Sequence, residues 1–234
     1  MKVLVFDLQA KLAHFRRPDT TSTHVTYPFI TRTALRGMLG SILGMEEFCG
    51  EAWTGIQLLS PVKTVSQELS LLGKGFLGGG GDSFNRPTSI ELVVNPHYRI
   101  YYQGEHLEEL AAAIREQRSG YHTYLGSAFA LTVPRYVNVV EMQMVPLDEA
   151  KTKELHSCTV VPVQIIRQLS VHPQVQYGRV GGILYESIGG RRFRGAVHVV
   201  YEVEGKPVHF YPRSSASPEV RILASGQEEV VCLW

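Results

Sequence analysis

The chain has 234 residues, of which 44% are hydrophobic and 19% charged, and its formal net charge is +1. Such a composition supplies a buried core and excludes a disordered chain. No run of about 18 or more apolar residues occurs, which excludes a membrane-spanning helix. The alternating N-terminus lacks the apolar block of a signal peptide, so we expect a cytoplasmic protein without membrane contacts.

The predicted elements of the first part of the chain alternate between strand and helix. Apolar alternation predicts a buried strand over residues 2–12. A long polar connection follows, and apolar residues at helical spacing then predict an amphipathic helix over 31–44. The next predicted elements are a strand broken by Pro61 over 54–72, a glycine-rich loop over 73–89, a strand kinked at Asn95-Pro96 over 90–105, a helix over 106–118 and a strand over 134–147.

This order is the βαββαβ pattern of a ferredoxin-like (RRM-like) domain, which we place at residues 1–148. The middle strands, interrupted by the glycine-rich loop, are expected to project as a β-hairpin. Residues 149–234 are predicted to form a smaller, mostly-β region with a hairpin over 193–212 that turns at Glu204-Gly205. The predicted fold class is therefore α+β.

The helix predicted over 31–44 carries a stripe of glycine opposite its apolar face, at Gly37, Gly40 and Gly44. Each glycine costs roughly 0.5–1 kcal/mol relative to alanine in a helix interior. A face without side chains allows another backbone to approach, and Arg32 and Arg36 beside it suit a phosphate chain. Close packing within the same subunit is the alternative.

The charge is unevenly distributed along the chain. Residues 1–45 carry net +4, residues 46–150 net −6, residues 151–200 net +5 and residues 201–234 net −2. Two basic segments favour an anion-binding face if folding brings them together. An ordinary solvated surface is the alternative.

Three further motifs offer groups that hold phosphates or stack on bases. They are "HFRRPDTTSTHVTY" with Arg16, Arg17 and Tyr27, "SGYHTYLG" with Tyr121, His122 and Tyr124, and "GGRRFRG" with Arg191, Arg192 and Arg194. A polar loop or a structural contact is the alternative for each motif. The glycine-rich loop is not a Walker A motif, because Lys74 is followed by Gly75.

Residues for catalysis or metal binding form no recognisable pattern. The cysteines Cys49, Cys158 and Cys232 lie far apart without a CxxC pair, which predicts neither a disulfide framework nor a zinc site. GxSxG, HExxH and metal-spaced carboxylates are absent, and the nine histidines are scattered. We therefore expect no catalytic residue, no metal and no cofactor.

The segments "VFDLQAKLAHFRRP", "TRTALRGMLGSILG", "SPVKTVSQELSLL", "NRPTSIELVVNPHYRIYY" and "YHTYLG" together resemble one family. The sequence is similar to the Cas-five family of CRISPR-associated RAMP proteins, and it looks like the type I-B or I-A branch. The motifs cover most of residues 1–146 in family order, whereas the C-terminal third is much less diagnostic.

The resemblance implies a subunit of a type I CRISPR Cascade surveillance complex. Family members have a ferredoxin-like domain with a projecting β-hairpin thumb, which would span about residues 63–90 here. They cap the complex at the 5′ handle of the CRISPR RNA and contact the Cas-seven backbone subunit and the large subunit. The resemblance implies these partners here, and it leaves contact with target DNA near the PAM open.

The expected RNA-binding residues come from the motifs and from this resemblance. They are Arg16, Arg17, Tyr27, Arg32, Arg36, Gly37, Lys63, Lys74, Arg86, Tyr121, His122, Tyr124, Arg191, Arg192 and Arg194. We expect a non-catalytic RNA-binding subunit that acts in antiviral defence or RNA-guided DNA targeting.

Two alternatives remain. The first is a metal-independent endoribonuclease that processes CRISPR repeat RNA, as in the type I-C branch. It needs an acid, a base and a positive charge close together, for which Tyr27, His24 and Lys63 are candidates. The second is a scaffold that binds only protein. Salt separates the scaffold from an RNA binder, because affinity that depends on phosphate contacts falls steeply with ionic strength.

Overall fold

The computed structural model describes residues 1–20, 23–48, 50–74, 83–146, 150, 152–187, 192–213, 220–224 and 229–234, with residues 72–74, 83–84, 187 and 229 described by their backbone alone. Two α-helices occur within these residues, α1 (Arg32–Leu43) and α2 (Leu107–Arg115). The N-terminal strands are β1 (Lys2–Gln9), β2 (Leu12–Ala13), β3 (Ala52–Leu58), β4 (Thr64–Lys74), β5 (Ser83–Val94), β6 (His97–Gly104), β7 (Arg135–Glu141) and β8 (Gln143–Met144).

The remaining strands are β9 (Leu155–Ser157), β10 (Val161–Pro162), β11 (Ile166–Leu169), β12 (Tyr177–Ser187), β13 (Phe193–Glu202), β14 (Val208–Pro212), β15 (Arg221–Ala224) and β16 (Glu229–Leu233), with a 3-10 turn at Val163–Ile165. Strands therefore dominate the described chain, and the predicted α+β class is confirmed. None of the described helices has the length and apolar character needed to span a bilayer.

Four strands form the central antiparallel sheet, in the order β3-β6-β1-β7. Helix α1 lies between β1 and β3 in the chain, and α2 lies between β6 and β7. The apolar alternation of β1 buries Leu4, Phe6 and Leu8 in the main core, whereas Val3 and Val5 pack with β15 and β16 on the opposite side. The central sheet is therefore covered on both faces.

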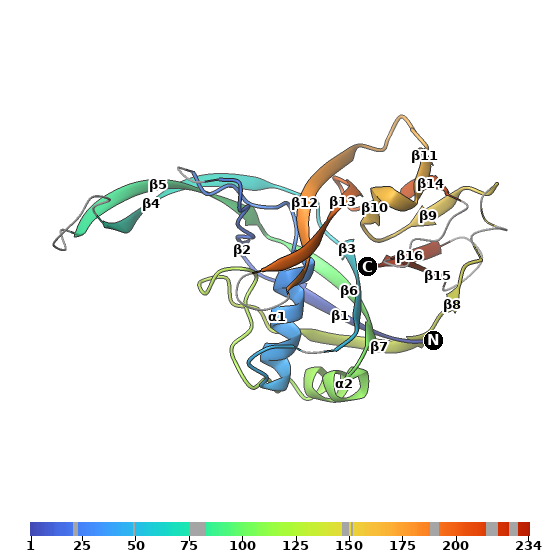
Figure 1. Cartoon of the computed structure of the whole chain (residues 1–234), viewed down its shortest axis with the longest axis horizontal. Coiled ribbons are helices and arrows are strands. Elements are labelled where there is room, and N and C mark those ends of the chain that lie inside the picture. Colours follow the sequence, from blue (N-terminus) through green and yellow to red (C-terminus); the bar gives the residue numbers. More distant parts are fainter. Residues whose placement is uncertain are drawn as a thin grey trace.

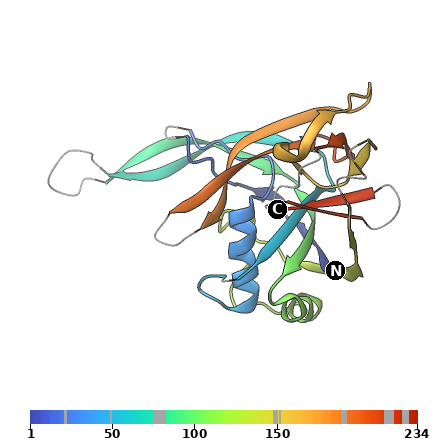
Figure 2. The ribbon, with the colours of Figure 1, turned by 45° about the vertical axis from the view of Figure 1, so that its right-hand side comes forward.

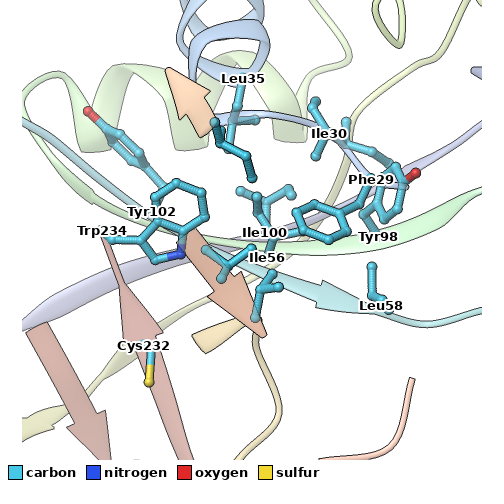
Figure 3. Packing of buried hydrophobic residues seen from close by; sticks show 14 of the residues in the cluster. Phe29, Ile30, Leu35, Ile56, Leu58, Tyr98, Ile100, Tyr102, Cys232 and Trp234 are labelled. Carbon is cyan, nitrogen blue, oxygen red and sulfur yellow. The ribbon is translucent and has the colours of Figure 1, made fainter. Parts of the chain in front are cut away.

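The main core lies under α1 and is filled by large side chains from several elements. Figure 3 shows Leu35 of α1 above Ile56 and Ile100 of the sheet, with Trp234 at one side and Phe29 at the other. This core continues into side chains of β9 to β16. Apolar contacts therefore join the residues before and after position 148, and the domain boundary placed there stays a prediction.

Strands β4 and β5 form a long antiparallel hairpin, from Thr64 paired with Val93 to Lys74 paired with Ser83. Figures 1 and 2 show this hairpin projecting away from the rest of the molecule. The predicted projecting hairpin is thus present, and the glycine run at its centre lies outside the described residues. We call the β4–β5 hairpin the thumb.

The strand predicted over 90–105 is two strands in two sheets. Asn95 adopts φ +48°, a left-handed conformation that ends β5 before β6 begins. β5 then pairs with β2 and β4, whereas β6 joins the central sheet. The predicted kink is the point where the chain leaves the thumb.

The prediction of a hairpin over residues 193–212 is wrong. The turn exists, since Gly205 has φ +88° and its N–H donates to Glu202, but the two flanking strands enter different sheets. β13 pairs with β12 and β10, whereas β14 belongs to a sheet ordered β11-β14-β9-β16-β15-β8. The hairpin that does form is β12–β13, which the sequence pattern did not reveal.

Candidate nucleic-acid interface

The polar connection after β2 folds back on itself against the base of the thumb. The N–H of Tyr27 donates to the Phe15 carbonyl at 2.7 Å, and the N–H of Arg17 donates to Val25 at 2.9 Å. His24 forms a parallel bridge with Ile90 of β5, which fixes this connection to the thumb. We call residues 14–27 the arm.

The arm and the thumb bring two arginines and a histidine together. Burial lowers the pKa of His24, and the nearby guanidinium groups of Arg16 and Arg86 lower it further. Arg16 comes from the arm and Arg86 from β5, so the fold unites two of the predicted RNA-binding residues. Both are exposed, and neither guanidinium forms an ion pair within the part of the chain that the structure describes. We call Arg16, His24 and Arg86 the thumb-base cluster.

A hollow of about 600 Å³ opens beside this cluster. It lies between the arm, the first turn of α1 and the β12–β13 hairpin, which runs close to α1 in Figure 2. Its lining combines Arg16 with Thr33 of α1 and Phe193 of β13, and the ring of Phe193 is 41% exposed. The hollow therefore offers a charge, hydroxyl groups and an open aromatic face, which are the groups that hold a single nucleic-acid strand.

The first turn of α1 also lines the hollow, through Thr31, Thr33 and Ala34. Thr31 caps the helix, because its side chain accepts a hydrogen bond from the N–H of Ala34 at 3.3 Å. The first turn carries no acidic residue, so its positive dipole end is not neutralised there. A helix start of this kind favours an anion such as phosphate.

Arg32 does not face this hollow, and the expected phosphate contact is corrected. Its side chain is buried, and its guanidinium donates to the carbonyls of Tyr185 and Trp234. Burial also lowers its pKa. The helix turns Arg32 towards β12 and β16, where it holds backbone instead of RNA.

Arg36 is also turned towards the protein. Its guanidinium donates to the carbonyls of Phe48 and Gly50, at 3.2 and 3.1 Å, and lies over the Phe48 ring. These bonds hold the loop after α1 against the helix. The side chain is half-buried, so part of it stays accessible.

The glycine stripe of α1 is divided between two roles. A Cβ on Gly40 would contact the backbone of Met45 and Phe48 at 3.4 Å, and Gly44 ends the helix at φ +73°. These two positions agree with close packing inside the subunit. Gly37 is exposed and has open space around it, so its position stays consistent with the approach of another molecule.

Two arm residues do not fit their expected roles. Tyr27 is only 5% exposed, and its hydroxyl donates to the Gly182 carbonyl at 3.0 Å, so no base can stack on this ring. Arg17 forms an ion pair with Asp19 at 2.7 Å. Of the three RNA-binding residues expected in the arm, Arg16 therefore remains available, whereas Arg17 and Tyr27 are engaged by the protein.

The other predicted residues occupy varied places. Tyr121, His122 and Tyr124 are exposed on the loop after α2, and Lys63 is exposed at the foot of the thumb. Arg194 is exposed and pairs with Glu186, and Arg192 is exposed beside Phe193. Lys74 is described by its backbone alone, and Arg191 lies outside the described residues.

Sequence reasoning missed the hollow itself and the part that Thr33 plays in lining it. Phe193 was visible as the aromatic residue inside an arginine motif, but nothing placed it beside the arm, 177 positions from Arg16. The β12–β13 hairpin makes this connection, and that hairpin was not predicted. His24 was a candidate as an acid or base and as one of the phosphate-holding groups of its motif.

Comparison with known proteins agrees with the resemblance found in the sequence. The profile of the family described as CRISPR-associated protein (Cas_Cas5) matches residues 3–68, which include β1, the arm and α1. No curated protein matches the chain.

Solved structures share the fold over nearly the whole chain. A CRISPR protein from Archaeoglobus fulgidus is similar with a TM-score of 0.57 and 11% identity, over 99% of this chain and 98% of that chain. A chain of a CRISPR RNA-guided surveillance complex gives 0.52 and 14%, over 91% and 92%. A structure described as a Cas protein gives 0.50 and 16%, over 87% and 95%. The chain thus matches the Cas_Cas5 family profile over residues 3–68, and its overall fold is similar to that of solved CRISPR proteins.

Proposed function

We propose that this protein is a non-catalytic subunit of a type I Cascade complex that binds the 5′ handle of CRISPR RNA and caps the Cas-seven backbone. The observation that carries this proposal is the thumb-base cluster beside the hollow. Arg16 and Arg86 are exposed without an acidic partner in the described chain, and Phe193 adds an open ring nearby. Such a combination suits a flexible, single-stranded RNA end.

The central sheet supports the finer description of the fold. Its order of β3-β6-β1-β7, with α1 and α2 as the two helical connections, follows the βαββαβ arrangement that the sequence predicts. We infer a ferredoxin-like unit in which the thumb is an extension of the two middle strands. In this arrangement RNA follows the arm side of the unit, where the thumb begins.

An exposed apolar loop supports contact with a neighbouring subunit. Between α2 and β7 several large side chains are between 45% and 61% exposed, namely Tyr121, Tyr124, Phe129, Leu131 and Val133. Several large apolar side chains exposed on one loop are typical of an interaction site. We infer that this loop contacts another protein subunit, either the Cas-seven or the large subunit. Tyr121 and Tyr124 would contact this subunit in addition to RNA.

The test is binding of a labelled RNA that carries the repeat-derived 5′ handle. Fluorescence anisotropy is measured over a range of salt concentrations for the wild type, Arg16→Gln and Arg86→Gln. We expect each substitution to weaken binding and to reduce the steepness of the salt dependence by about one phosphate contact. Arg115→Gln is the matched control, because Arg115 is exposed on α2, away from the thumb in Figure 1.

The same samples separate the alternatives. Equal losses in Arg115→Gln would show that the thumb-base cluster has no special role. Binding of the Cas-seven subunit without any RNA affinity, and without salt sensitivity, would favour the protein-only scaffold. RNA products of defined length in EDTA, abolished by His24→Asn, would make the protein a processing nuclease.

A further inference from the structure

Histidines that are scattered in the sequence come together on the outer face of the C-terminal sheet. His156 of β9 and His209 of β14 are directly paired across the two strands, with ring centroids 4.3 Å apart. His172, in the connection after β11, lies against His209 at a centroid distance of 4.8 Å. Glu154, just before β9, completes the group. Four residues from three separate segments therefore converge.

The potential ligand atoms lie close to one another. Nε2 of His172 is 3.6 Å from one carboxylate oxygen of Glu154, and Nε2 of His156 is 3.8 Å from the other. One ligand atom each from Glu154, His172 and His209 can be chosen so that all lie within 4.8 Å. Ligands bound tetrahedrally at about 2.1 Å stand roughly 3.4 Å apart, so shifts of about 1 Å complete the shell.

The polar groups of this cluster are held in place but incompletely used. Within the described residues Nδ1 of His209 is buried and has no hydrogen-bond partner. A buried polar nitrogen without a partner is costly, unless a ligand satisfies it. The N–H of His209 is fixed by the Tyr177 hydroxyl, and the N–H of Ser170 donates to the His209 carbonyl. The backbone beneath the cluster is therefore well supported.

The chemistry of these groups also suits a cation. Imidazole nitrogen and carboxylate oxygen are the side-chain atoms that most often bind transition-metal ions.

We propose that Glu154, His172 and His209 bind a divalent transition-metal ion of the zinc class, with His156 as an adjacent fourth ligand. Imidazole nitrogen with one carboxylate suits Zn²⁺, Co²⁺ or Ni²⁺, whereas Mg²⁺ and Ca²⁺ prefer oxygen shells. This replaces the expectation of no metal, which rested on sequence spacing alone. The ion would join β9, β14 and the connection after β11.

The test is titration of the untagged protein with ZnCl₂ in competition with a chromophoric chelator. We expect one tightly bound Zn²⁺ per chain, and a rise of the unfolding temperature with Zn²⁺ but not with Mg²⁺. His172→Ala and His209→Asn should each weaken zinc binding by at least about tenfold. His172 is exposed, so its variant should fold normally, which far-UV circular dichroism checks.

The matched control is His106→Ala, because His106 also faces a carboxylate, that of Glu109 at 3.1 Å, but lies outside this cluster. The control should bind zinc like the wild type. X-ray absorption of the zinc-loaded wild type should show imidazole nitrogen in the first coordination shell. Equal zinc affinity in all four proteins, or a first shell without imidazole, would overturn the proposal.

Discussion

The guanidinium of Arg32, in the first turn of α1, donates a hydrogen bond to the main-chain carbonyl of Trp234, beyond β16. The same carbonyl accepts from the hydroxyl of Thr54 at 3.1 Å, and the N–H of Trp234 donates to Thr54 at 3.0 Å. One buried arginine thus connects the helix, the central sheet and the last described strand. Residues 202 positions apart are joined in the core beneath α1.

This connection predicts that Arg32 stabilises the folded protein. Arg32→Ala removes a buried donor and leaves the carbonyls of Tyr185 and Trp234 with fewer partners, so the free energy of unfolding should fall by about 2–4 kcal/mol. Urea unfolding followed by circular dichroism measures this. Arg16→Gln, on the surface, should change stability by less than about 0.5 kcal/mol.

Two glycine substitutions should have opposite effects on stability. A Cβ on Gly120 would lie 2.3 Å from the Cα of Gly44, so Gly120→Ala must push the loop away from the end of α1 and should cost about 1–3 kcal/mol. Gly37 has open space around it, so Gly37→Ala should stabilise α1 by about 0.5–1 kcal/mol. Thermal unfolding of both variants checks this, and equal effects would contradict the close packing of Gly120 against Gly44.

Gly37→Leu separates helix stability from contact with another molecule. Gly37 is exposed and a Cβ there meets nothing within 4 Å, so the variant should be at least as stable as the wild type, as expected for Gly37→Ala. If RNA or a neighbouring subunit lies against this face, its affinity should drop by about tenfold or more. Gly37→Ala is the control for size, and unchanged affinity in a folded Gly37→Leu protein would remove Gly37 from the interface.

The local patterns of the sequence predicted much of the framework. Alternation in β1 and helical spacing in α1 are properties of neighbouring residues, and both elements form as expected. The partners of Arg32 could not be predicted, because β12 and β16 lie far along the chain. The error over residues 193–212 has the same origin, since Gly205 marks a turn but does not decide which strands pair.

The candidate site shows the same limit. Arg16 and Arg86 were chosen for their charge, and only the bridge between His24 and Ile90 brings them together. Tyr27 was chosen for its ring, but the pattern of the arm did not reveal that the ring is buried. The histidines of the proposed metal site looked scattered, because sequence distance says little about pairing across strands such as β9 and β14.

Stability should depend on pH through His24. The pKa of His24 in the folded protein lies below the usual 6.5. As the pH falls below about 6.5, the unfolded chain therefore binds more protons at His24 than the folded protein does. The stabilising contribution of neutral His24 is therefore complete above about pH 6.5 and is lost as the pH falls through its folded pKa. Between pH 7.5 and pH 5, His24→Asn should lose less unfolding free energy than the wild type, as measured by urea titration at both values.

RNA binding should reverse this effect at the same residue, if the proposed interface is correct. Phosphate beside Arg16 and Arg86 offsets the positive charges that lower the pKa of His24, so the complex should take up a proton. Affinity for the 5′ handle should therefore rise between pH 7.5 and pH 6 in the wild type, and this rise should be smaller in His24→Asn. Anisotropy titrations at constant ionic strength measure both. An identical pH dependence in the two proteins would place the RNA away from the thumb-base cluster, because a phosphate in contact with these arginines must influence the imidazole between them.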